Sequence, residues 1–241
     1  MKLFSIRIIV FFFFVLFLAS CSEHIVGEGE TVSQTFLPVS NFSKISVDND
    51  IDVTVKYSTT KKVEVAGYKN LVEKVRISAT NGTLRIAMKD EYTYDNMNLT
   101  AVVSLPSFSQ IFVTHNGNVE IDSFPNIFTT LHFGLSSNGN LTTLHPLTSQ
   151  GMTADLSGSG SVTINGVCKN LDLNLTSSGN WNGFNHSCGT ATVNITNQGQ
   201  AEVSPEFKLN ATISGSGNIY YKRYPVVLST ITGTGAAIDA N

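Results

Sequence analysis

Gly158-Ser159-Gly160-Ser161-Val162 is one copy of a short motif that recurs through the second half of the chain. The other copies share its central glycine and an apolar residue two positions later: Asn116-Gly117-Asn118-Val119, Asn138-Gly139-Asn140-Leu141, Ser178-Gly179-Asn180-Trp181, Gln198-Gly199-Gln200-Ala201, Gly215-Ser216-Gly217-Asn218-Ile219 and Gly233-Thr234-Gly235-Ala236-Ala237. Successive central glycines are 22, 21, 19, 20, 18 and 18 residues apart. A repeat of this length, with room for two strands in each unit, is typical of a β-solenoid.

The sequence around each of these glycines keeps a fixed register. The residue four positions earlier is apolar in all seven copies: Val113, Leu135, Leu156, Leu175, Ile195, Ile213 and Ile231. Apolar residues alternate with Ser, Thr, Asn and Asp on both sides of the glycine, which is the period of half-buried strands. Stacked units would place Leu156, Leu175, Ile195 and Ile213 over one another at about 4.8 Å. We expect the corner glycines to supply a positive φ.

This register predicts an all-β protein that folds as a right-handed parallel β-helix-like solenoid with coils of about 20 residues. An antiparallel meander or sandwich with similar turn spacing is the competing interpretation. Residues 35–110 do not share the register, because Ser78 stands four positions before Gly82. We therefore expect one domain over residues 35–241, with an N-terminal β cap over 35–110 and seven glycine-cornered repeats over 111–241. Within the cap, Asn81-Gly82 predicts a hairpin turn, and residues 68–74 have room for one turn of helix.

The first twenty residues have the pattern of a targeting segment. Lys2 and Arg7 precede an unbroken apolar run from Ile8 to Leu18, which leads into Ala19-Ser20-Cys21. This pattern resembles the lipobox of bacterial lipoproteins, and the resemblance implies cleavage after residue 20 and acylation of Cys21, with palmitate as an expected lipid. By the same resemblance, Ser22 implies sorting to the outer membrane. An ordinary signal peptide with an incidental cysteine is the alternative, and the apolar run is short for a membrane span. We expect a signal peptide over 1–20 and a tether over 21–34.

Composition limits the classes of function. The chain has 241 residues, of which 14% are charged, and its formal net charge is −3. That length is ample for one domain with a substantial core. From residue 115 onward the only Lys and Arg side chains are Lys169, Lys208, Lys222 and Arg223. Nucleic-acid binding requires a basic surface, so we expect no nucleic-acid partner.

Several short motifs occur in the order found in one bacterial family. They include Phe42-Ser43-Lys44-Ile45-Ser46-Val47, Ile51-Asp52-Val53-Thr54-Val55, Asn70-Leu71, Asn81-Gly82-Thr83-Leu84-Arg85-Ile86, Leu105-Pro106 ahead of the glycine turns, and Gly217-Asn218-Ile219-Tyr220-Tyr221 followed by Tyr224-Pro225. Together they resemble the GIN domain family, described as "putative auto-transporter adhesin" head domains of bacterial surface and periplasmic proteins. The resemblance covers roughly residues 40–239 and implies an adhesin-like role without known catalytic residues. Several turns here are Asn-Gly or Gln-Gly where the family has Ser-Gly-Ser-Gly.

The sequence offers no clear catalytic or metal site. β-Helix enzymes that act on polysaccharides need clustered carboxylates, and the nearest approach to such a pair is Asp155 with Asp172 on neighbouring coils. The segment Gly158-Ser159-Gly160 is better explained as a corner than as a nucleophile elbow. The histidines lack the spacing of metal ligands, and Asp48 to Thr59 fails the EF-hand pattern. We expect no enzyme activity and no cofactor or metal.

Cys168 and Cys188 occupy nearly the same place on adjacent coils. They lie eight and nine residues after Gly160 and Gly179. Layers spaced at about 4.8 Å would bring their Cα atoms within disulfide reach if one residue is absorbed in the loop. An extracytoplasmic compartment permits oxidation. A structural disulfide and two free thiols in the packed interior are both compatible with the sequence.

Three functions from different classes are compatible with these features. The leading hypothesis is a non-catalytic, lipid-anchored cell-envelope protein whose Ser, Thr and Asn ladders bind glycans or proteins, on either side of the outer membrane. Phe184, Tyr220 and Tyr224 are the candidate aromatics for sugar stacking, although ordinary strand aromatics fit the pattern equally well. The second hypothesis is a structural protein that self-associates through an edge coil or a face. The third, less favoured, is a polysaccharide-active enzyme.

Overall fold

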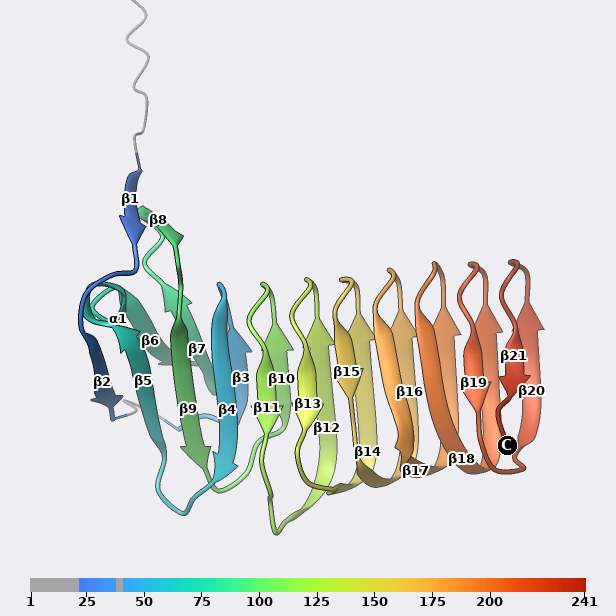
Figure 1. The fold of residues 1–241 in the computed structure, drawn as a ribbon. Coiled ribbons are helices and arrows are strands. Elements are labelled where there is room, and N and C mark those ends of the chain that lie inside the picture. The colour runs from blue at the N-terminus through green and yellow to red at the C-terminus, as the bar shows by residue number, and fades with distance from the viewer. Residues whose placement is uncertain (1–21, 38–40) are drawn as a thin grey trace, which may run out of the picture.

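The computed structural model describes residues 22–37 and 41–241, and the regular secondary structure of these residues is almost entirely β-strand (Figure 1). The expected signal peptide and Cys21 lie outside the described residues. Within the described part of the chain, no helix is long and apolar enough to cross a membrane.

The elements run in the following order along the chain: β1 (Glu23–Val26), β2 (Thr31–Phe36), β3 (Lys44–Val47), β4 (Ile51–Tyr57), β5 (Lys62–Tyr68), α1 (Lys69–Val72), β6 (Val75–Thr80), β7 (Thr83–Met88), β8 (Tyr92–Asp95), β9 (Leu99–Leu105), β10 (Gln110–Val113), β11 (Val119–Ile121), β12 (Ile127–Leu135), β13 (Leu141–Thr143), β14 (Leu147–Leu156), β15 (Ser161–Thr163), β16 (Gly166–Leu175), β17 (Asn180–Ile195), β18 (Gln200–Ile213), β19 (Ile219–Tyr221), β20 (Val226–Ile231) and β21 (Ala237–Asp239).

The strands form a solenoid with two parallel stacks. The rear stack in Figure 1 is β7, β3, β10, β12, β14, β16, β17, β18 and β20, and the front stack is β9, β4, β11, β13, β15, β17, β18, β19 and β21. Strands β17 and β18 are long enough to contribute to both stacks. Each coil rises in the rear stack and descends in the front stack while advancing toward the C-terminus, which is a right-handed path (Figure 1). The predicted parallel solenoid is confirmed.

The inner columns of the solenoid follow the apolar register of the sequence. Leu156, Leu175, Ile195 and Ile213 are paired directly from one strand to the next, and each is at most 1% exposed. A continuous apolar column buries each coil against both neighbours, and this burial is the main stabilising term.

The reason for glycine at the corners differs from the prediction. Among the described residues, the only glycines with a positive φ are Gly29, Gly67, Gly82 and Gly166, so none of the repeat corners is in that conformation. Instead, a Cβ atom on Gly199 would lie 2.6 Å from the carbonyl oxygen of Gly179, and the clash at Gly160 with Gly139 would be closer still. Stacking brings successive corner backbones together, and only a residue without Cβ permits that approach.

The N-terminal part contributes more to the parallel stack than expected. Strands β3 and β4 form a coil of their own, which lies directly against β10 and β11. Its corner contains no glycine: Asn49 there has a φ of 63°, and Ile51 holds the position that corresponds to Gly117. The column of buried aliphatic residues also continues, through Val47 on β3 and Ile86 on β7. The sequence register missed this coil because its corner contains no glycine.

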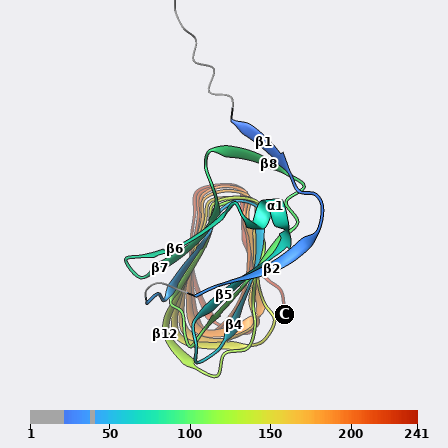
Figure 2. The same ribbon diagram turned by 90° about the vertical axis from the view of Figure 1, so that its left-hand side faces the viewer.

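The cap proper consists of antiparallel strands. β5 pairs antiparallel with β2 and β9, and β6 pairs antiparallel with β7. Seen from the N-terminal end, β2, β5 and α1 cross over the opening of the solenoid (Figure 2). This arrangement closes the apolar interior at that end.

The expected tether over 21–34 is partly wrong, because most of it is strand. β1 pairs with β8 in parallel, and β2 pairs with β5. His24 Nδ1 lies 3.0 Å from Thr93 Oγ1 on β8, and Val32 and Phe36 of β2 pack against the core. The apolar alternation in this segment is too short to predict a strand without its partners.

Candidate functional site

A shallow groove crosses the front stack near the N-terminal end of the solenoid. It has a volume of about 580 Å³, and it is lined by residues of five neighbouring strands: Asp52, Val53, Thr54, Thr100, Asn118, Val119, Glu120, Asn140, Thr142, Ser161 and Thr163. Because side chains alternate between the two faces of a strand, the buried Val53, Val119, Leu141 and Val162 hold their polar neighbours toward solvent. The groove therefore presents two parallel rows of polar side chains.

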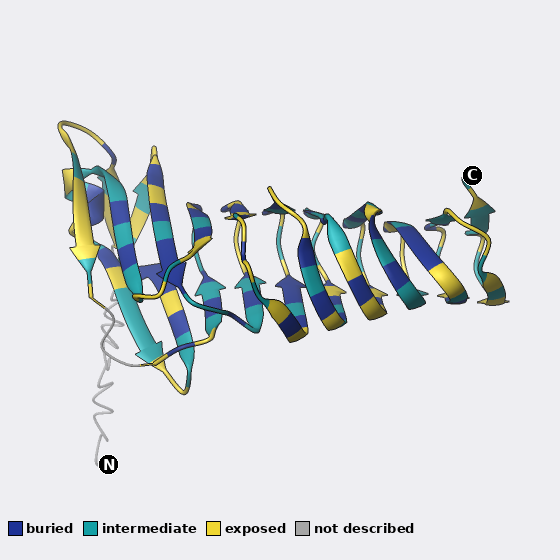
Figure 3. Ribbon diagram, turned by 90° about the horizontal axis from the view of Figure 1, so that it is seen from below, coloured by how far each residue is buried: buried dark blue, intermediate teal, exposed yellow. Residues whose placement is uncertain are grey.

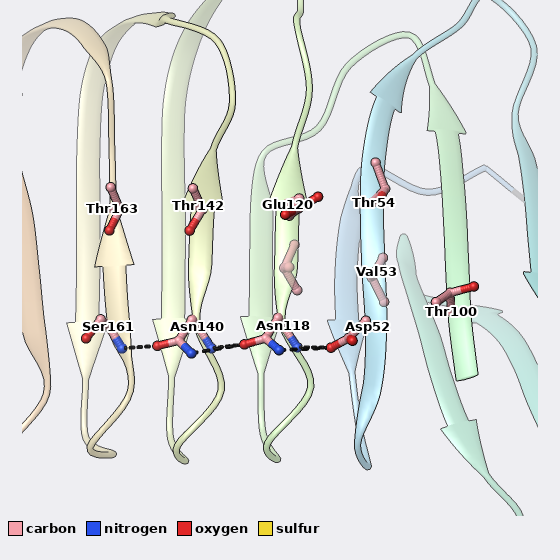
Figure 4. Close-up of a pocket in the computed structure, with 11 residues that line it drawn as sticks. Asp52, Val53, Thr54, Thr100, Asn118, Glu120, Asn140, Thr142, Ser161 and Thr163 are labelled. Atoms are coloured by element: carbon pink, nitrogen blue, oxygen red, sulfur yellow. Dashed lines mark hydrogen bonds between the residues drawn. The ribbon is translucent and has the colours of Figure 1, made fainter. Parts of the chain in front are cut away.

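The row nearer the glycine corners is hydrogen-bonded along its length (Figure 4). Asn140 Nδ2 donates to Asn118 Oδ1 at 3.0 Å, and Asn118 Nδ2 donates to Asp52 Oδ1 at 3.0 Å. The backbone N–H of Ser161 donates to Asn140 Oδ1 at 3.0 Å. These bonds use the side-chain groups of the row internally and fix their rotamers. This amide ladder is a rigid wall of the groove.

The second row is more open to a ligand. It consists of Thr54, Glu120, Thr142 and Thr163, which lie side by side on β4, β11, β13 and β15. Thr163 Oγ1 accepts a hydrogen bond from Asn182 Nδ2 at 3.1 Å. Thr54, Glu120 and Thr142 make no side-chain hydrogen bond with another described residue. Their hydroxyl and carboxylate groups are free to bind a ligand. We call Thr54, Glu120 and Thr142 the open row.

The charge of the groove favours some ligands over others. Asp52 and Glu120 are its charged lining residues, and no Lys or Arg side chain is among the groove residues. A phosphate or other anion would be repelled by these two carboxylates. Neutral ligands rich in hydroxyl groups can both donate to Glu120 and exchange hydrogen bonds with the threonines.

The three aromatic residues proposed from the sequence lie elsewhere. Phe184 is on β17, with the ammonium of Lys222 4.5 Å from its ring centroid. Tyr220 is on β19, where its hydroxyl accepts a hydrogen bond from Asn218 Nδ2 at 3.4 Å. Tyr224 follows β19 and is 87% exposed. None of the three lines the groove, and their role in stacking stays a prediction.

The carboxylates considered for catalysis lie on the rear stack. Asp155 is paired with Asn174, and Asp172 with Thr153, so the two acids are diagonal neighbours on β14 and β16. Asp155 Oδ1 accepts a hydrogen bond from Asn174 Nδ2 at 2.8 Å, and its other oxygen lies 3.6 Å from His132 Nε2. Asp155 is thus part of a surface network of side chains. In the described part of the chain, no three His, Cys, Asp or Glu residues are grouped so as to hold a metal ion.

Cys168 and Cys188 lie directly opposite each other on β16 and β17. The one-residue offset is absorbed just before them, because Thr163 pairs with Asn182 while Gly166 pairs with His186. Both cysteines are buried free thiols in the structure. The hydrogen bond between the Cys168 and Cys188 thiols and the burial of Cys168 both raise the pKa of Cys168. The disulfide stays a prediction.

Sequence reasoning did not single out the groove. The sequence does contain a pattern that marks the groove. The residues one and three positions after the corner glycine are polar in three neighbouring repeats: Asn118 and Glu120, Asn140 and Thr142, Ser161 and Thr163. The contribution of Asp52 and Thr54 could not be found in this way, because their coil lacks the glycine.

The fold and groove define a parallel β-solenoid with a polar groove on one face. The family model described as "Putative auto-transporter adhesin, head GIN domain" matches residues 41–225, and the chain belongs to this family. No curated protein matches the chain in sequence.

Several solved structures have a similar fold. A putative adhesin from Bacteroides fragilis is 19% identical, with a TM-score of 0.79 over 88% of this chain and 98% of that chain. A "putative lipid binding protein" from Parabacteroides distasonis is 19% identical, with a TM-score of 0.70 over 90% of this chain and all of that chain. A putative adhesin from the same organism is 24% identical, with a TM-score of 0.66 over 89% of this chain and 99% of that chain. At these identities the likeness concerns the fold alone.

Proposed function

We propose that this protein is a non-catalytic, lipid-anchored cell-envelope module that binds a neutral glycan in the groove of the front stack. The observation that carries the proposal is the open row, whose Glu120 carboxylate and Thr54 and Thr142 hydroxyls have no partner in the described chain. The family description as an adhesin head domain agrees with a binding role.

The groove chemistry suits sugar hydroxyl groups. A hydroxyl both donates and accepts hydrogen bonds, which matches threonine hydroxyls beside a carboxylate. Neighbouring strands repeat these groups at about 4.8 Å, so an extended glycan can meet several of them in succession. The adjacent amide ladder is already ordered by its own hydrogen bonds, which lowers the entropic cost of binding.

The affinity of a single site should be modest. The groove is open and contains no aromatic side chain on which a sugar ring could stack. A few hydrogen bonds to a ligand that must give up water contribute little net free energy. We expect a dissociation constant of the order of 100 μM to 1 mM.

The anchor is the second part of the proposal. Cleavage before Cys21 and acylation of its thiol would hold the solenoid at the outer membrane through the short segment that precedes β1. One acyl group gives reversible membrane binding, so stable anchoring needs more than one chain. Metabolic labelling with a palmitate analogue tests this directly. We expect label on the natural chain and none on Cys21→Ser; equal label on both would contradict the anchor.

Binding is tested with the mature chain in which Cys21 is replaced by serine. A glycan array identifies the ligand class, and isothermal titration calorimetry measures the affinity of the best hit. Glu120→Gln and Thr142→Val should each weaken binding about tenfold. Thr212→Val, a matched change on the outer face of the rear stack, should leave the affinity unchanged.

Other results would redirect the proposal. Equal affinity of the Glu120→Gln variant and the parent chain would contradict the groove as the site. Binding to neutral phosphatidylcholine vesicles without glycan binding would favour a lipid ligand. Release of reducing sugar during the titration would contradict the non-catalytic assignment.

A further inference from the structure

Large exposed apolar side chains are concentrated at the C-terminal end of the solenoid. Figure 3 shows this end as largely exposed or half-buried, in contrast to the buried inner strands of the preceding coils. The largest exposed fractions there are Tyr224 87%, Phe207 70%, Val226 64%, Leu228 53% and Ile231 42%.

The apolar interior is open at this end. Ile231 continues the column of Ile195 and Ile213, but Ile213 is fully buried while Ile231 is 42% exposed. Val227 and Ala237, which follow the buried Leu209 and Ile219 in their own columns, are also only partly buried. The difference arises because no described strand covers the outer side of β20 and β21.

The backbone of this last coil is also unpaired on one side. Thr232 N–H donates to Ile213 O, so the backbone groups of alternate residues point toward β18. By the alternation of a strand, the N–H and C=O of Val227, Ser229 and Ile231 point toward the open edge. An edge of this kind pairs readily with another strand.

The usual protection of an edge is missing here. Residues 226–241 contain no Lys, Arg or Pro, and Asp239 is their only charged side chain. At the opposite end, β2, β5 and α1 cover the interior (Figure 2), and ion pairs such as Lys62–Glu64 lie on the cap. The two ends of the solenoid are therefore not equivalent.

We propose that the C-terminal edge, formed by β20 and β21, is a contact surface for a second copy of this chain, with the two copies related by a two-fold axis. A two-fold axis perpendicular to the solenoid sets strands of the two edges antiparallel and brings the same surface of each copy together. Two nearly uncharged edges meet without like-charge repulsion, and the open ends of the two apolar interiors cover each other. A head-to-tail contact lacks this match, because the N-terminal end is capped.

The expected size of the contact sets its strength. A strand of six residues spans about 20 Å, and two sheets about 10 Å apart with their outer side chains give a similar thickness. The footprint is then about 400 Å² on each copy, or roughly 800 Å² in total, which is below the size of a stable interface. We expect a dimer with a dissociation constant of the order of 100 μM.

This contact is independent of the groove. The groove lies on β9, β4, β11, β13 and β15, several coils away from β20 and β21. Loss of glycan binding with dimerisation intact, or the reverse, separates the failure of one proposal from that of the other.

The test is sedimentation equilibrium of the mature chain with Cys21 replaced by serine, over about 5 to 500 μM so that the expected constant is bracketed. Ser229→Pro removes an edge-facing N–H without breaking a bond to β18, and proline is tolerated at such edge positions. Ser229→Lys keeps that N–H and places a charge at the open end of the interior. Ser229→Ala is the matched control, because it removes only the hydroxyl.

The parent chain and Ser229→Ala should show a concentration-dependent dimer, and both Pro and Lys variants should raise the dissociation constant at least about tenfold. Circular dichroism with unchanged thermal unfolding shows that the variants are folded. A parent chain that is monomeric at every concentration overturns the proposal. So does a dimer unaffected by both edge variants, or a series of species larger than the dimer.

Discussion

Gly160 lies so close to the carbonyl oxygen of Gly139 on the preceding coil that a Cβ atom could not be accommodated. The same close approach recurs at the later corners, where Gly217 faces Gly199 and Gly235 faces Gly217. The corner glycines are thus fixed by the spacing between coils, and this relationship can be tested by substitution.

Gly160→Ala should lower the free energy of unfolding by about 1–3 kcal/mol, because the added methyl group forces two corner backbones apart. Urea unfolding followed by circular dichroism measures the change. The matched control is Gly151→Ala on β14, where the nearest atom to the new Cβ is 3.7 Å away. It should be neutral or stabilising by up to about 1 kcal/mol. Equal effects of the two substitutions would contradict the steric account.

His186 predicts a loss of stability in mild acid. Its side chain is fully buried, its ring meets Trp181 edge-on, and neither ring nitrogen has a hydrogen-bond partner among the described residues. Burial lowers the pKa of His186 to about 4 from 6.5. The neutral form is therefore favoured in the folded state. The free energy of unfolding is therefore highest above pH 6.5, where His186 is neutral in both states. It falls by about 3 kcal/mol as the pH falls toward 4, because the unfolded state then binds a proton that the folded state does not.

Urea unfolding at pH 7.0 and pH 4.5 measures this effect, and the variant His186→Leu serves as its control. Leucine has no proton to gain, so the variant should lose much less stability over the same interval. If both proteins lose stability equally between these pH values, His186 is not the titrating group.

Asp48 predicts a second acid transition at lower pH. Burial raises its pKa, but hydrogen bonds from Arg85, Thr114 and Ser46 outweigh burial and hold the pKa below 3.8. Arg85 Nε donates a hydrogen bond to Asp48 Oδ2 at 2.6 Å, and this bond joins β7 to the corner of the β3–β4 coil. This stabilisation is present above the ordinary pKa of an aspartate and is lost as the pH falls below it. Asp48→Asn should cost about 1–2 kcal/mol at pH 7, measured by urea unfolding; an unchanged midpoint would show that the network is unimportant.

Cys168 and Cys188 predict a redox-dependent stability. If they are oxidised, the closed loop of about 20 residues should stabilise the protein by about 3 kcal/mol. Mass spectrometry of the alkylated, non-reduced chain should show a peptide pair joined through the two sulfurs, and thermal unfolding should shift downward on reduction. Cys188→Ala should remove that shift. Alkylation of both thiols in protein taken from the cell envelope would contradict the disulfide.

The sequence was most informative where the repeats are regular. Apolar residues at a fixed offset from glycine predicted the column through Leu156 and Leu175, because burial depends on position in the strand and little on the exact side chain. The hairpin at Asn81-Gly82 and the short helix α1 were also predicted correctly, with φ values of 51° and 76° at the turn. These elements depend on local chemistry or on a strict period.

The parts that depend on long-range pairing could not be predicted. The coil formed by β3 and β4 has Asn49 at its corner, so the glycine repeat does not reveal it. Strand β2 is stabilised by its pairing with β5, and its own sequence gives little signal. The groove required both kinds of information, because Asp52 from the glycine-free coil continues a ladder of repeat residues. The positive φ expected at the corners was wrong because stacking, and not turn type, selects glycine there.

The most direct test of glycan binding at the open row is a titration of the ¹⁵N-labelled mature chain, with Cys21 replaced by serine, followed by NMR chemical shifts. Upon addition of the glycan selected by the array, the amide signals that move should cluster at residues 52–54, 118–120, 140–142 and 161–163. Shifts confined to the region of Phe184, Tyr220 and Tyr224, or spread evenly over the chain, would contradict the proposed site.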